Sequence, residues 1–170
     1  MFERSELTSL IRQAHPEVEA DTPTQALAEL GGVIDAIPYR WLYWPDLLKV
    51  HGAPFVDLYG VGGDGIGDRL SRIIGSRPPG RSLEEWKECV DSFNYFEIAH
   101  LFRRWGGTYD SLETSHLALA ELLQEPWRAR LQSSYPEFSP TVRALLPDGD
   151  VGVCIAVVQD IGDLEVPNGW

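Results

Sequence analysis

Two Glu-x-x-His pairs are the feature of the sequence best suited to chemistry. Glu97 is followed by His100, and Glu113 by His116, each at a spacing of three residues. Residues i and i+3 share one face of a helix, so each pair could present a carboxylate and an imidazole together. Two such pairs on antiparallel neighbouring helices form half of a ferritin-like di-iron ligand set, and the same ligand types suit zinc. One alternative is therefore a metal-binding protein or metalloenzyme that uses these four residues.

The rest of that ligand set is missing from the sequence. A di-iron site needs one more glutamate from each of two further long helices, and no such helices are predicted. Glu97 and Glu113 are only 16 positions apart, which places both pairs near an interhelical turn. The simpler interpretation is a Glu-His hydrogen bond that satisfies two polar groups inside the core. We therefore expect no metal ion or other cofactor.

A glycine-rich segment, residues 60–67, matches the pattern G-x-G-x-x-G between a predicted strand and a predicted helix. Asp64 places a negative charge where a pyrophosphate would lie, and the chain lacks the alternating strands and helices of a dinucleotide-binding sheet. We interpret the segment as a mobile surface turn. The sequence has no G-x-S-x-G motif, and Cys89 and Cys154 both lie in apolar runs. No catalytic residue is predicted.

Four aromatic residues and an arginine lie close together between Pro38 and Pro45. Tryptophan, tyrosine and arginine are the residue types that dominate binding energy at protein interfaces. The candidate partner-binding residues are Arg40, Trp41, Tyr43 and Trp44. With alternating faces, Trp41 and Tyr43 would be buried and Arg40, Leu42 and Trp44 exposed, or the reverse. The competing interpretation is that most of these rings belong to the core.

Helical periodicity and capping residues predict the elements that position these groups. Helices are expected over residues 5–14, from Thr22 to about residue 30, over 46–51 and in a short stretch ending at residue 74. A long helix should begin at a capping box at Ser82 and continue to residue 101, and a second should cover 111–124, with Pro126 kinking or restarting it. Strands are expected over residues 55–59, 138–146 and 151–159, with a turn at 147–150.

These elements predict an α+β fold, in which an antiparallel helical pair packs against a small, mostly antiparallel sheet with a C-terminal β-hairpin. Residues 1–170 are expected to form a single domain, with residues 76–81 as an internal loop and 161–170 as an irregular tail. Trp170 either adds to a binding face or lies in a disordered terminus.

The charge balance restricts the partners of this chain. Fourteen basic residues against 26 acidic ones give a formal net charge of −12. This charge disfavours nucleic acid and anionic membranes, and it either keeps the protein in solution or complements a basic protein partner. Two cysteines form no disulfide framework, and no signal peptide or membrane span is apparent, so a cytoplasmic location is expected. Twelve of the fourteen basic residues are arginines, which is typical of high-GC bacterial genomes.

Prolines, glycines and aromatic residues recur at separated positions. They are Ile37-Pro38, Trp44-Pro45-Asp46-Leu47-Leu48, His51-Gly52, Phe55, Tyr59-Gly60, Trp127, Leu131 and Tyr135-Pro136, followed by the predicted hairpin. This distribution resembles small acidic bacterial proteins of the polymorphic-toxin immunity type. The resemblance implies a binding protein that works by occlusion, and it assigns no functional residue. We therefore expect a non-enzymatic, cytoplasmic protein-interaction module that neutralises a toxin with a basic surface.

Overall fold

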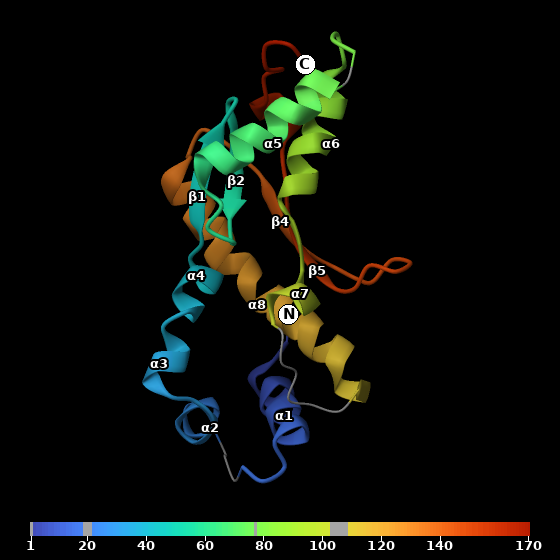
Figure 1. The fold of residues 1–170 in the computed structure, drawn as a ribbon. Coiled ribbons are helices and arrows are strands. Elements are labelled where there is room, and N and C mark those ends of the chain that lie inside the picture. Colours follow the sequence, from blue (N-terminus) through green and yellow to red (C-terminus); the bar gives the residue numbers. More distant parts are fainter. Residues whose placement is uncertain (1, 19–21, 77, 103–108) are drawn as a thin grey trace.

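The N-terminal part of the chain is a series of helices that lies apart from the sheets (Figure 1). The computed structural model describes residues 2–18, 22–76, 78–102 and 109–170. Its first elements are α1 (Arg4–Ala14), α2 (Pro23–Leu30), α3 (Val33–Ala36) and α4 (Tyr39–Tyr43). The expected cap of α2 is confirmed, because the Thr22 hydroxyl accepts a hydrogen bond from the Gln25 N–H at 3.3 Å. We refer to α1, α2 and α3 together as the arm.

A β-hairpin follows α4 and corrects one sequence prediction. Residues 46–51 were expected to be helical, but β1 (Asp46–Val50) pairs antiparallel with β2 (Ala53–Asp57). His51 and Gly52 form the connection, with φ values of 48° and 77°. Positive φ at both central residues is the signature of a type I′ turn, whose twist suits a two-residue hairpin. The pair that was interpreted as a helix terminus is therefore a strand connection.

The second correction concerns the long helix expected from residue 82 to residue 101. A capping box starts α6 (Leu83–Phe93) as predicted, since the Ser82 hydroxyl accepts from the Glu85 N–H at 3.2 Å and the Glu85 carboxylate accepts from the Ser82 N–H at 2.9 Å. The helix ends at Asn94, and the chain continues as β3 (Tyr95–Glu97) and the short α7 (Ile98–Leu101). The apolar spacing beyond Asn94 was therefore misinterpreted as helical.

Buried Asn94 explains why the helix stops there. Its side-chain amide donates to the Pro54 carbonyl at 3.0 Å, and its side-chain oxygen accepts from the Val56 N–H at 2.9 Å. Its backbone carbonyl accepts from the Val157 N–H at 2.9 Å. One residue thus joins the β1–β2 hairpin to the second sheet.

That second sheet confirms the α+β class and the C-terminal hairpin. Its strand order is β3-β5-β4. The strands β4 (Thr141–Leu145) and β5 (Cys154–Val158) pair antiparallel, with Arg143 opposite Ala156. The helix α8 (Tyr109–Ser134) contacts β4 and β5, and it is one helix through Pro126 rather than two. A 3₁₀ turn, η1 (Ile161–Asp163), follows β5.

Buried side chains form two clusters. The first lies between α8 and the three-stranded sheet and includes Phe96, Leu123, Trp127, Ile155 and Val157. The second lies between α5 (Gly62–Ser76), α6 and β2, and it includes Phe55, Leu70, Trp86, Phe138 and Trp170. Trp170 was expected either on a binding face or in a disordered terminus, but it packs at 5.0 Å between ring centroids against Trp86. Its indole N–H donates to the Ser82 carbonyl at 3.1 Å.

Both cysteines are free thiols. Cys154 is buried, as its apolar surroundings predict, whereas Cys89 is only partly buried. In the part of the chain that the structure describes, no helix combines the length and the apolar character needed to cross a bilayer.

Candidate partner-binding surface

The aromatic block folds as a short helix and exposes its rings. Pro38 precedes α4 with φ −61° and ψ −25°, and the helix ends at Trp44, whose N–H donates to the Arg40 carbonyl at 2.9 Å. In a helix the side chains are spread over all directions, so the strict alternation considered from the sequence does not occur. Within α4 only Leu42 is buried, while Trp41 is 47% exposed and Trp44 is 38% exposed.

The inner side of α4 is fixed to α8. The Trp127 indole N–H donates to the Leu42 carbonyl at 2.7 Å, in a buried position. The Arg130 guanidinium donates through Nε to the Pro45 carbonyl at 3.1 Å, and its carbon lies 5.6 Å from the centroid of the Trp44 ring. These contacts fix the backbone of α4 at both Leu42 and Pro45 and place the Arg130 guanidinium beside the Trp44 ring.

Arg40 is paired within the surface itself. Its guanidinium donates to the Trp44 carbonyl at 2.8 Å and to the Asp46 carboxylate at 3.1 Å. The guanidinium carbon also lies 5.6 Å from the Trp41 ring centroid, within the range of a cation–π contact. The structure therefore brings all four predicted residues together. We call the surface formed by Tyr39, Arg40, Trp41, Tyr43 and Trp44 the aromatic surface.

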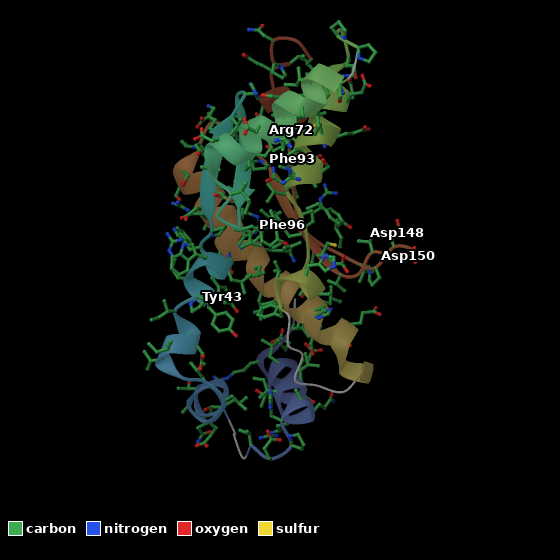
Figure 2. All side chains as sticks on the ribbon, in the orientation of Figure 1. Tyr43, Arg72, Phe93, Phe96, Asp148 and Asp150 are labelled. Carbon is green, nitrogen blue, oxygen red and sulfur yellow. The ribbon has the colours of Figure 1, made fainter. Side chains whose placement is uncertain are left out.

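Tyr43 is the member of this surface whose hydroxyl is most affected by its surroundings. Burial raises its pKa, and the neighbouring Tyr39 adds to the same effect. The hydroxyl therefore stays protonated and can donate a hydrogen bond at any physiological pH. Figure 2 shows Tyr43 on α4, well separated from Asp148 and Asp150 in the loop between β4 and β5.

Sequence reasoning missed the exposed aliphatic side chains that precede the aromatic surface. They are Leu27, Leu30, Val33, Ile34 and Ile37. Ala26, Leu27 and Leu30 have the spacing of an apolar helical stripe, but of these three only Ala26 is buried. The signal was the interruption at Gly31-Gly32, because helices this short cannot place every apolar residue against one core. Contiguous exposed apolar side chains mark interaction sites in soluble proteins.

The two Glu-x-x-His pairs do not lie on two long neighbouring helices as the metal hypothesis required. Glu97 is the last residue of β3, and its carboxylate lies 3.4 Å from Nδ1 of His100, a side chain that is 72% exposed. The same carboxylate accepts a hydrogen bond from the Gly152 N–H at 3.2 Å. The pair is a local contact at the end of β3, and because His100 is exposed, the expected Glu-His pair inside the core is wrong for these two residues.

Glu113 and His116 lie on α8 and line a hollow of about 360 Å³ next to the loop between β4 and β5. Burial lowers the pKa of His116, and the Glu97 carboxylate only partly opposes this effect. Among the residues with described positions, no three His, Cys, Asp or Glu side chains are grouped as a metal ion would require.

The glycine-rich segment has a structural role in starting a helix. The predicted mobile turn is shorter than expected, because α5 begins at Gly62. The Asp57 carboxylate accepts hydrogen bonds from the Val61 N–H at 2.7 Å and the Gly62 N–H at 2.8 Å. A phosphate at this helix terminus would need the same N–H groups, and these groups already donate to the Asp57 carboxylate.

No protein-family model matches the chain, and neither a curated protein nor a solved structure matches it. What the chain does is therefore inferred from its own surface.

Proposed function

We propose that this chain is a non-enzymatic, cytoplasmic protein-interaction module that binds a basic protein partner through the aromatic surface. The observation that carries the proposal is a cluster of exposed aromatic side chains on a helix whose inner side is fixed by Trp127 and Arg130. Large aromatic residues on a preorganised surface are the usual energetic centre of a protein interface.

The net charge supports a basic partner. A charge of −12 attracts a cationic protein over a distance of about one Debye length and so raises the association rate. The mode of action that suits such a surface is occlusion, in which the bound chain covers the working surface of its partner. A toxin with a basic substrate-binding face is the partner class that we favour.

The test begins with capture of the partner from cells in which the chain is naturally made, followed by binding measurements with both purified proteins. We expect Trp41→Ala/Trp44→Ala to weaken binding by at least ~30-fold, which corresponds to about 2 kcal/mol, typical of hot-spot residues. The matched control is Leu146→Ala, an exposed residue in the loop between β4 and β5. Binding should also weaken as ionic strength rises.

If the partner is a toxin, the wild-type chain should restore growth of cells that express it, and the double variant should not. A partner that is bound equally well by the double variant, and with the same affinity at low and high salt, would contradict the proposal.

A further inference from the structure

A groove of about 640 Å³ lies between the helices of the arm. Its walls are mainly aliphatic, and they include Ile11, Ala26, Leu27, Leu30, Val33 and Ala36. Tyr39 is another lining residue, and because Tyr39 also belongs to the aromatic surface, the two features are continuous. In Figure 1, α2 and α3 lie at the lower left, away from both sheets. We propose that this groove binds a basic amphipathic helix of the protein partner, an inference that rests on the proposed function.

The groove is too open for a small molecule. Its wall residues Leu27 and Val33 are 63% and 83% exposed. Pockets for small ligands enclose roughly 70–90% of the ligand surface, which such exposed walls cannot do. A helix laid along the groove would cover these side chains and gain the free energy of removing them from water.

The secondary structure around the groove selects a helix over an extended peptide. The lining residues come from α1, α2, α3, the Gly31-Gly32 connection and the first residue of α4. The groove itself therefore offers no strand edge. An extended peptide would place unpaired backbone N–H and C=O groups against an apolar wall, whereas a helix satisfies these groups internally. Grooves for proline-rich peptides are lined by aromatic rings, and this one is aliphatic.

The charges around the groove select a basic helix. Among the described residues that line the groove, the charged one is Asp35, which accepts a capping hydrogen bond from the Gly32 N–H at 3.2 Å. The cation nearest in sequence, Arg40, is already paired with Asp46. A second copy of the chain is disfavoured, because it would bring two bodies of charge −12 together.

The probe for this inference is a synthetic peptide of about 18 residues, which spans roughly 27 Å as a helix. Leucines occupy one helical face and lysines the rest. Two control peptides complete the set: one has the same composition in an order that forms no apolar face, and the other carries glutamate in place of lysine. Binding of each labelled peptide to the full-length chain is followed by fluorescence anisotropy. The groove variant is Leu27→Ser/Val33→Ser, and the control variant is Leu146→Ser/Val151→Ser, all at exposed positions.

We expect the lysine peptide to bind at least tenfold more tightly than either control peptide. The groove variant should weaken this binding at least tenfold, while the control variant leaves it unchanged. Equal binding of the control peptides, or an unaffected groove variant, would overturn the inference. A wild-type dimer in sedimentation that the groove variant dissociates would also overturn it, because a second copy would then be the occupant.

The two proposals can fail separately. If the natural partner loses affinity for Trp41→Ala/Trp44→Ala but not for Leu27→Ser/Val33→Ser, the proposed function holds and the groove inference fails. If the groove variant weakens the natural partner and Trp41→Ala/Trp44→Ala does not, the groove inference holds and the proposed centre of the interface is wrong.

Discussion

Asn94 offers the sharpest test of how this fold is held together. It is fully buried, and its side chain makes one hydrogen bond to the Pro54 carbonyl and one from the Val56 N–H. Asn94→Ala removes both and leaves two buried backbone groups without partners. Each unsatisfied group costs about 1–3 kcal/mol, so the free energy of unfolding should fall by about 2–6 kcal/mol.

Urea unfolding, followed by tryptophan fluorescence and far-UV circular dichroism, measures this loss as a shift in the midpoint. The matched control is Gln132→Ala, which removes an exposed amide from α8 and should change stability by less than about 0.5 kcal/mol. If both variants lose the same small amount, the proposed link between the two sheets is not a source of stability.

Asn94→Asp separates the two hydrogen bonds by their chemistry. The introduced carboxylate can still accept from the Val56 N–H, but it cannot donate to the Pro54 carbonyl. Only the protonated acid can donate there, so the folded state should bind a proton more readily than the unfolded chain, whose carboxyl titrates near about pH 3.9. The variant should therefore lose stability, relative to wild type, as the pH rises above that value. A stability difference that does not change with pH would refute the assignment of donor and acceptor.

Two further predictions concern α8 and its neighbours. Trp127→Phe keeps a ring in the core but removes the hydrogen bond to the Leu42 carbonyl, so it should cost about 1–2 kcal/mol and speed hydrogen exchange in α4; unchanged exchange would contradict the proposed attachment. Because burial lowers the pKa of His116, the neutral imidazole contributes stability that is complete above about pH 6.5 and is lost as the pH falls. His116→Gln should flatten this part of the stability profile in urea unfolding at several pH values, and identical slopes for wild type and variant would show that this imidazole is not the source.

Local signals in the sequence were reliable where the neighbouring residues alone decide the structure. The N-caps at Thr22 and Ser82 were predicted correctly, because a hydroxyl that accepts from an N–H three residues later is a short-range interaction. The strand β5 was also predicted, because the apolar period shortens toward two residues after Pro136, as it does in strands.

Elements that depend on distant contacts could not be predicted in this way. The helix α6 ends because the Asn94 side chain bonds to a hairpin about 40 residues earlier, although the apolar spacing continues past that point. The β1–β2 turn was missed because His51-Gly52 resembles a helix terminus as well as a type I′ turn. Four of the five residues of the aromatic surface were identified from their types, but their exposure depends on Leu42 and Trp127, which only the fold brings together.

The helix α1 packs against α8, and this contact bears on the order in which the chain can fold. About 100 residues separate the two helices along the sequence, and α1 has no fully buried residue of its own. During synthesis at roughly 5–20 residues per second, α8 would be made several seconds after α1. Closing so long a loop is entropically slow, so the arm should dock after the sheets have formed and should be the first part to detach. A chain built in this order completes the arm last, once the sheets and α8 that support it have formed.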